Sequence, residues 1–142
     1  MQNGNRLQLL FNDLLVAILS LERSLEIDLT KFSEFETDII KNGQIQKFEY
    51  TIELLWKTLK KFFEVKREKV FLYPKDVIKA CFAEDIIDEN SYLILIDAIE
   101  SRNLLSHVYK IEMFDLIYPQ LNLYAKAIRY TITAIEPYTI QN

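Results

Sequence analysis

The chain is almost without the residues that end helices and build tight turns. It contains 2 glycines and 3 prolines among 142 residues, whereas 50% of its residues are hydrophobic. Both turn-forming residues lie far below their average usage, so the connections between elements must be few. The hydrophobic fraction is large enough to bury one continuous core in a chain of this length. We therefore expect an all-α fold, with a single domain over residues 1–142.

Apolar residues recur at helical spacing over the first half of the chain. Residues 5–27 place them at alternating steps of four and three, which predicts one buried stripe on a helix. Thr30 or Ser33 can cap a second helical stretch, in which the Asn-Gly pair at 42–43 predicts a stop or a kink. The pattern then resumes over residues 44–66 as the strongest stripe of the chain, which consists of Ile45, Phe48, Ile52, Leu55, Trp56, Leu59, Phe62 and Phe63.

The next stretch contains the only strand-like composition. Residues 70–73 read Val-Phe-Leu-Tyr, but no second strand is evident to pair with them, so we expect a loop. Proline then opens a short helix over residues 74–82. Asp88 is a good N-cap for a further helix, which carries into residues 102–109.

A last helix is predicted over about residues 112–135. Pro119 must kink this helix or lie near its start, because proline lacks the N–H that the helix requires. Its inward side should consist of Met113, Leu116, Ile117, Leu121, Tyr124, Ile128 and Ile132. Short connections between long amphipathic helices imply antiparallel neighbours, so the predicted architecture is an up-and-down bundle of four to five helices.

Charge is distributed unevenly along the chain. The net charge of −4 argues against a protein that coats nucleic acid without sequence preference. Residues 41–79 nevertheless carry a net positive charge, and their cations gather at Lys57, Lys60, Lys61, Lys66, Arg67 and Lys69. This basic cluster could guide a polyanion or an acidic partner, or it could be a solvated helix end whose cations complement the helix dipole.

The sequence also bears on the compartment. No apolar run approaches the length of a membrane span, and no signal core follows the N-terminal residues. The one cysteine, Cys81, excludes an internal disulfide, and its apolar neighbours favour a packed, inert thiol over a nucleophile. We expect a cytoplasmic protein with no membrane association, no metal and no cofactor.

The candidate for chemistry is the segment RNLLSHVY at residues 102–109, which contains the only histidine of the chain. Histidine takes and gives a proton near neutral pH, and arginine holds a phosphate through charge-assisted hydrogen bonds. Together they suggest phosphodiester chemistry without a metal. His107 would act as general base or acid, Arg102 would stabilise the phosphate, and Asn103 or Ser106 would orient it. The products would be a 2′,3′-cyclic phosphate and a 5′-hydroxyl.

Helix geometry places a condition on this site. Five residues correspond to about 140° of rotation on an ideal helix, so Arg102 and His107 would not share a face. Either the helix loosens before His107 and lets the arginine fold back, or the two groups meet across a twofold axis. The second arrangement predicts a homodimer.

Simpler structural roles exist for the same residues. A single histidine at a helix end is more often a C-terminal cap or a packed polar group, and Tyr109 alone fits the edge of a core. The aromatic residues of the 44–66 stripe have the spacing of a buried helix face, not of a stacking platform. Glu49 and Glu53 could form a paired-carboxylate site, but further metal ligands are not evident, so we expect them to be solvated or paired with Lys57.

Two segments of the sequence resemble a known family. Residues 42–57 read NGQIQKFEYTIELLWK, close to the D-G-x-I-Q-R-F-E-F-T-x-E-L-x-W-K stretch of the nucleotidyltransferase substrate-binding proteins, a branch of the HEPN superfamily of helical bundles. Residues 102–109 fit the superfamily's R-x4-H pattern and its extended R-x4-H-x-Tyr form. The resemblance covers nearly the whole chain, and it implies a HEPN-like domain with its core at about residues 6–135. The departures are Asn42 for the usual aspartate, Lys47 for arginine, and Ser101 for a residue that is commonly acidic.

The resemblance implies a homodimeric HEPN-like bundle that works beside a separately encoded minimal nucleotidyltransferase, often as a toxin–antitoxin pair. In that scheme the protein is a metal-independent RNase toxin. Arg102 and His107 would be its catalytic residues, Asn103 a supporting polar residue, and Tyr109 the tyrosine to which the partner transfers AMP. Such an adduct would put negative charge where the RNA phosphate must bind.

A second function remains open at this point. The chain could be a non-catalytic module that provides a substrate- or nucleotide-binding surface to a nucleotidyltransferase complex. Arg102 and His107 would then bind a nucleotide or acceptor phosphate instead of cleaving RNA.

Overall fold

A computed structural model describes residues 2–107 and 111–139 of the chain. Within these residues the structure is helical and has no strand; its elements are α1 (Gln2–Leu25), η1 (Leu29–Lys31), α2 (Glu34–Lys66), α3 (Pro74–Ala83), α4 (Glu89–His107), α5 (Ile111–Ile117), η2 (Tyr118–Gln120) and α6 (Leu121–Thr139). The elements η1 and η2 are short 3-10 helices. Because α1, α2, α3, α4 and α6 are the helices of ten or more residues, the predicted all-α bundle of four to five helices is confirmed.

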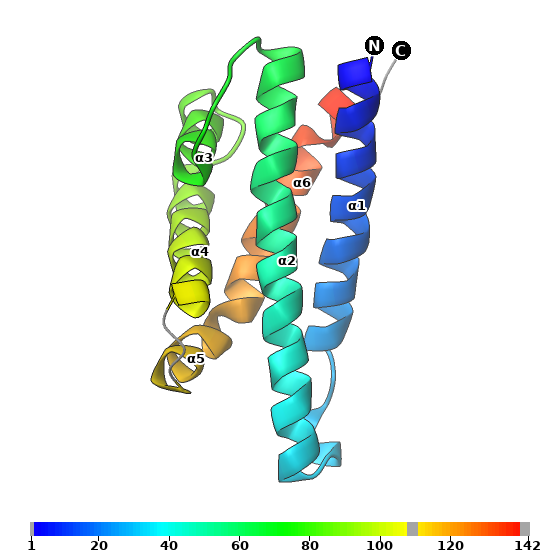
Figure 1. The fold of residues 1–142 in the computed structure, drawn as a ribbon, viewed down its shortest axis with the longest axis vertical. Helices are drawn as coiled ribbons and strands as arrows, with labels where there is room; N and C mark the ends of the chain where they lie inside the picture. The colour runs from blue at the N-terminus through cyan, green and yellow to red at the C-terminus, as the bar shows by residue number, and fades with distance from the viewer. Residues whose placement is uncertain (1, 108–110, 140–142) are drawn as a thin grey trace.

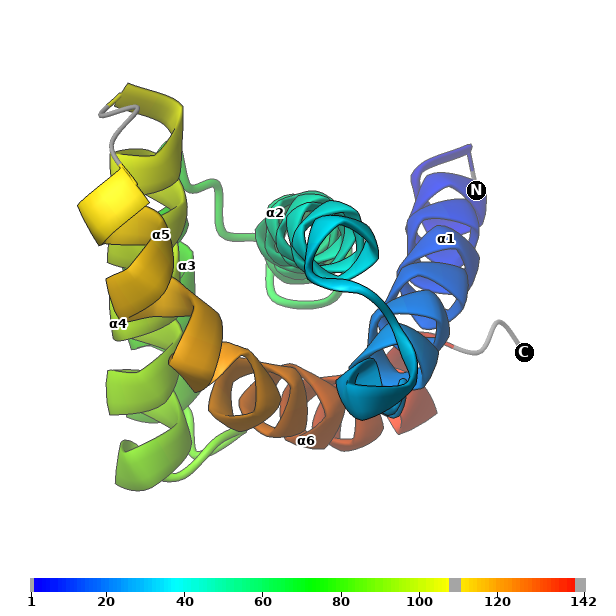
Figure 2. The same ribbon diagram turned by 90° about the horizontal axis from the view of Figure 1, so that it is seen from below.

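α2 is the central helix of the bundle (Figure 1). In the view from below, α1 lies on one side of α2, whereas α3 and α4 lie on the other side (Figure 2). α6 runs across the lower part of this view, between the two sides. Two ring pairs show that α6 runs parallel to α2, because Phe48 meets Tyr124 and, two heptads further along both helices, Phe62 meets Tyr138. α1 and α4 run in the opposite direction, so the predicted up-and-down order is also confirmed. Of the helices described, none has both the length and the apolar character that crossing a membrane requires.

A row of buried polar side chains on α2 fixes its register against α1. The amide of Gln44 donates to the Ser24 carbonyl of α1. The hydroxyls of Thr51 and Thr58 donate within α2, to the carbonyls of Lys47 and Leu54, and also lie near two carbonyls of α1. The contacts are Gln44 Nε2 to Ser24 O at 2.7 Å, Thr51 Oγ1 to Ala17 O at 3.4 Å and Thr58 Oγ1 to Leu10 O at 3.5 Å. The contacting residues are seven apart on both helices, the repeat with which one side of a helix keeps facing its partner.

α2 runs unbroken through Asn42 and Gly43, so the predicted stop or kink is wrong. The helix begins after Ser33, one of the two predicted caps, whose hydroxyl accepts from the Glu36 N–H at 3.1 Å while Glu36 Oε1 accepts from the Ser33 N–H at 2.9 Å. The Asn42 side chain donates to the Asp38 carbonyl at 2.9 Å, within the helix. A glycine ends a helix by adopting a positive φ, and Gly43 does not do so.

The predicted last helix is divided at Pro119 into α5, η2 and α6, as the missing N–H of proline requires. α6 continues to Thr139, beyond the predicted end. Among the predicted inward residues, Leu116 is 65% exposed and Met113 is only partly buried. The break at Pro119 resets the helical phase, so the stripe of α6 does not extend back through α5. The ring of Phe114 instead packs against the core and stacks on Tyr118.

The connection between α2 and α3 is a loop, as predicted. Residues 70–73 form no regular element, and Phe71 packs edge-to-face on Phe63 with ring centroids 5.2 Å apart. Cys81 on α3 is fully buried. Burial raises the pKa of its thiol to about 12, which agrees with a packed, inert cysteine.

Replacing Gly43 by alanine tests the continuity of α2. A Cβ built at this position meets nothing within 4 Å. Alanine should therefore raise the free energy of unfolding by about 0.5–1 kcal/mol, because it favours the helix and restricts the unfolded chain. Gln46→Gly, at an exposed position of the same helix, is the matched control and should lower it by a similar amount. Urea unfolding followed by circular dichroism measures both changes, and a destabilised Gly43→Ala would contradict the continuous helix.

Candidate functional site

Arg102 lies where α4 meets α2. Its Nη2 atom is 3.1 Å from Oε2 of Glu53 on α2, and 34% of its side chain is exposed. Its Nε atom is buried and has no hydrogen-bond partner among the described residues. The guanidinium is therefore held by one carboxylate and is only partly paired.

Glu53 is the centre of a small polar cluster on α2. Its Oε2 atom accepts a hydrogen bond from Trp56 Nε1 at 3.1 Å, and its Oε1 atom is 3.3 Å from the ammonium of Lys57. Burial would raise the pKa of Glu53, but the Trp56 hydrogen bond and the charges of Arg102 and Lys57 outweigh burial and hold the pKa below its usual 4.5. Glu53 is thus an anion near neutral pH, with two cations and an indole N–H around it.

The contacts of Glu53 and Trp56 differ in part from those predicted. The expected pairing of Glu53 with Lys57 is confirmed, but it is incomplete because Arg102 is a second partner. Trp56 was expected in the core and is only partly buried, with its indole N–H directed to Glu53. The spacings of Trp56 and Lys57 from Glu53 are those of helix neighbours and were visible in the sequence, whereas the partnership with Arg102 depends on how α4 packs.

Glu49 lies one turn before Glu53 on α2 and behaves differently. Burial raises the pKa of its carboxyl group, and the positive charge of Arg102 offsets only part of that effect. The two glutamates, four residues apart on α2, therefore have pKa values shifted in opposite directions. Glu53 is stabilised as an anion by specific partners, and Glu49 is not.

A polar relay between α4 and α6 fixes the residue before Arg102. Ser101 is 6% exposed, and its hydroxyl lies 2.8 Å from the hydroxyl of Tyr124 on α6. The Tyr124 hydroxyl donates to the Asp97 carboxylate, one turn earlier on α4. Burial and the Asp97 carboxylate raise the pKa of Tyr124 to about 12, so this donor stays protonated. The Tyr124 ring also stacks on Phe48 of α2, so α4 is oriented against both α6 and α2.

α4 remains helical as far as His107. Ser106 donates its hydroxyl to the Arg102 carbonyl at 3.1 Å, and Asn103 is exposed. His107 is the last residue of α4, and its side chain lies outside the described part of the chain, as does Tyr109 altogether. Because the backbone keeps its helical turns up to His107, the helix does not loosen before that residue. The loosening of the helix that the first of the two arrangements requires is therefore not seen.

The predicted basic cluster is largely paired in the structure. Its ion pairs are Lys57 with Glu53 at 3.3 Å, Lys61 with Glu64 at 2.9 Å, Arg67 with Glu84 at 3.3 Å and Lys69 with Glu84 at 2.9 Å. Neutralised cations give a weaker field for guiding a polyanion. The structure therefore favours the simpler interpretation of a solvated helix end.

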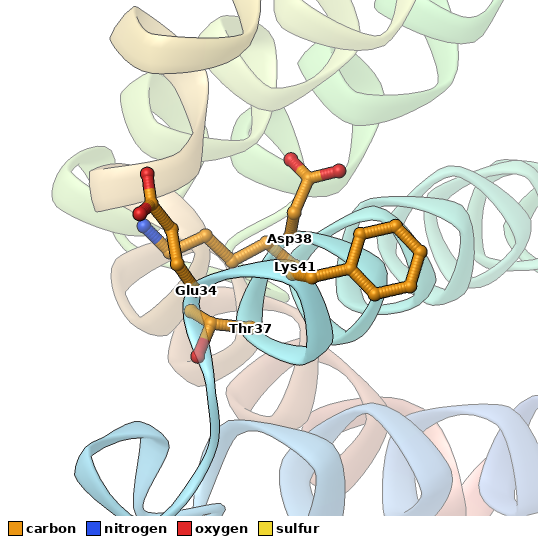
Figure 3. A pocket seen from close by; sticks show the side chains of 5 residues that line it. Glu34, Thr37, Asp38 and Lys41 are labelled. Atoms are coloured by element: carbon orange, nitrogen blue, oxygen red, sulfur yellow. The ribbon is translucent and has the colours of Figure 1, made fainter.

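A shallow hollow lies elsewhere, on the first two turns of α2 (Figure 3). Figure 3 shows side chains of both charges around it, and its lining consists of Glu34, Phe35, Thr37, Asp38 and Lys41. It includes neither Arg102 nor Glu53. Within residues 2–107 and 111–139, no three His, Cys, Asp or Glu side chains come together as a metal site would require.

The opposite pKa directions of Glu49 and Glu53 predict opposite effects on acid stability. The folded-state pKa of Glu53 lies below 4.5, so its stabilisation is complete above pH 4.5 and is lost as the pH falls through the folded-state value. The pKa of Glu49 is raised, so its ionisation lowers stability as the pH rises from 4.5 through its folded-state value.

We therefore expect Glu53→Gln to reduce the stability lost on acidification and Glu49→Gln to increase it. Urea unfolding between neutral pH and about pH 3 measures the free energy of unfolding for each variant and the wild type. If both variants moved the acid dependence in the same direction, the asymmetric pairing of the two glutamates would be wrong.

Comparison with known proteins agrees with this fold. The family described as "Nucleotidyltransferase substrate binding protein like" matches residues 9–136. A crystal structure of a protein from Thermus thermophilus is similar with a TM-score of 0.73 and 22% sequence identity, over 84% of this chain and 96% of that chain, which is a likeness of fold. No curated protein matches the chain. Because the family match spans most of its length, the chain belongs to the nucleotidyltransferase substrate binding protein like family.

Proposed function

We propose that the chain is the HEPN subunit of a two-protein module and cleaves RNA as a metal-independent endoribonuclease toxin. Its partner is a separately encoded minimal nucleotidyltransferase, in agreement with the family description. The partner neutralises it by transferring AMP to Tyr109. Both proteins act in the cytoplasm.

The helical backbone of α4 is the observation that carries this proposal. α4 continues to His107, so positions 102 and 107 lie about 140° apart around its axis. Arg102 is on the side that meets Glu53 of α2. Within one chain the two positions therefore face different directions, and a twofold homodimer would bring Arg102 of one copy to His107 of the other.

The chemistry follows from the two side chains. The imidazole of His107 takes the proton of a ribose 2′-hydroxyl as the 2′ oxygen forms a bond to phosphorus. The bond from phosphorus to the 5′ oxygen breaks, and the imidazolium returns the proton to that oxygen. Arg102 neutralises the charge that builds up on the phosphate, and the exposed Asn103 supports it with a hydrogen bond.

A second function is favoured by one specific contact. Arg102 already has a carboxylate partner in Glu53, which lowers its attraction for a phosphate. A non-catalytic subunit that holds the nucleotide or acceptor of a nucleotidyltransferase would need only moderate phosphate binding at this position. The family description is consistent with that role.

RNA cleavage separates the two functions. Purified protein with an unmodified Tyr109, checked by intact mass, should cleave bulk tRNA or mRNA in EDTA, and gels with labelled RNA give the rate. His107→Ala and Arg102→Ala should each lose about 10²-fold or more, because each removes a group used in the transition state. Arg23→Ala, at an exposed position on α1, makes the same charge change and should cleave normally. Absence of cleavage by the unmodified wild type would favour the binding subunit.

Mixing two inactive variants tests the site across the twofold axis. A dimer of one Arg102→Ala chain and one His107→Ala chain keeps one intact pair, made of the arginine of one copy and the histidine of the other. If subunits exchange freely, half of the dimers are mixed and each has one of two sites, so about a quarter of the wild-type rate should return. No recovery, with subunit exchange shown by native mass spectrometry, would contradict a site shared in this way.

A further inference from the structure

We propose that Glu53 is a positioning residue that fixes the guanidinium of Arg102 for the RNA phosphate. The catalytic consequence of this inference rests on the proposed function, whereas the contact itself does not. Glu53 belongs to α2 and Arg102 to α4, so the carboxylate acts on the reaction through the arginine. Trp56 and Lys57 hold Glu53 in turn.

The carboxylate of Glu53 connects Trp56 of α2 to Arg102 of α4. Trp56 Nε1 donates to Glu53 Oε2 at 3.1 Å, and the same oxygen is 3.1 Å from Arg102 Nη2. The indole is large and partly buried, so it restricts the carboxylate more than a surface lysine would. Lys57 Nζ lies 3.3 Å from the other carboxylate oxygen, which leaves Oε2 for Trp56 and Arg102.

Arg102 depends on this carboxylate for its orientation. The contact with Glu53 is its only ion pair within the described residues. Its Nε atom is buried without a hydrogen-bond partner there, so Nε does not hold the planar group in place. A long side chain with a fork of fixed donors recognises a phosphate well only when the fork is oriented beforehand.

The neighbouring carboxylate does not share this role. Glu49 is close enough for the charge of Arg102 to affect its ionisation, yet it forms no ion pair with Arg102. Glu64 further along α2 pairs with Lys61 at 2.9 Å, which makes it a matched control for the loss of one paired carboxylate from the same helix.

A positioning role and a competing role for Glu53 predict different kinetics. If Glu53 merely competed with RNA for Arg102, its removal would free a cation and cleavage would become faster. If it orients Arg102, its removal leaves the positive charge in place and loses the alignment needed in the transition state. Glu53→Gln should then lower kcat by about 10- to 100-fold while KM stays the same or falls. Glu64→Gln should leave both constants unchanged.

A second measurement does not depend on activity. Arginine Nε–Hε signals are observed by nitrogen-15 NMR, and Arg102→Lys identifies the signal of Arg102. In the wild type this signal should exchange slowly with water, because the guanidinium is held and Nε is buried. In Glu53→Gln the Arg102 Nε–Hε signal should exchange rapidly with water or broaden beyond detection, while the backbone spectrum stays intact. Glu64→Gln should leave the signal unchanged.

The outcomes separate this inference from the proposed function. An Arg102 signal that is unchanged in Glu53→Gln overturns the inference, whether or not RNA is cleaved. A signal lost in Glu53→Gln, with kcat unchanged or higher, overturns the positioning role. If the wild type cleaves no RNA, the proposed function fails, and the NMR comparison alone decides whether Glu53 fixes Arg102.

Discussion

The buried amide of Gln44 connects three elements of the bundle. It donates to the Ser24 carbonyl near the end of α1 at 2.7 Å and accepts from the Tyr118 hydroxyl of η2 at 2.5 Å. Leaving a buried donor or acceptor without a partner costs about 1–3 kcal/mol, so a shift of α2 along α1 is penalised at Gln44. The long central helix is thereby held at one register, and the remaining helices pack on it.

The position of Arg102 follows from that framework. Tyr124 stacks on Phe48 of α2 and hydrogen-bonds to Asp97 and Ser101 of α4, so one side chain relates three helices. With α4 oriented in this way, the next residue after Ser101 reaches α2 and meets Glu53. Ser101 departs from the commonly acidic residue of the resembling proteins, and Asp97 provides a carboxylate to the same relay one turn earlier. The polar site is therefore a consequence of helix packing and not of one contiguous motif.

Much of the fold was predictable because it depends on neighbours in the chain. The cap at Ser33, the break at Pro119 and the apolar stripe over residues 44–66 all depend on local sequence. The errors arose where a local signal competed with packing. Gly43 remains helical between the capping box at Ser33 and the buried residues of α2, which begin at Gln44. Leu116 is exposed because α5 does not continue the phase of α6. Trp56 has the spacing of the apolar stripe, but it lies at the edge of the core, where its indole N–H donates a hydrogen bond to Glu53.

The sequence by itself determined the helical class, the up-and-down order of the helices and the residues from which a site could be chosen. These follow from hydrophobic period and from the scarcity of glycine and proline, which act over a few residues. Only the tertiary structure decided that Arg102 meets Glu53, that Glu49 does not pair with it, and that α4 stays helical through His107. The physical reason is that an ion pair between helices depends on their relative rotation and register, which the whole core sets together and which no short stretch of the chain encodes.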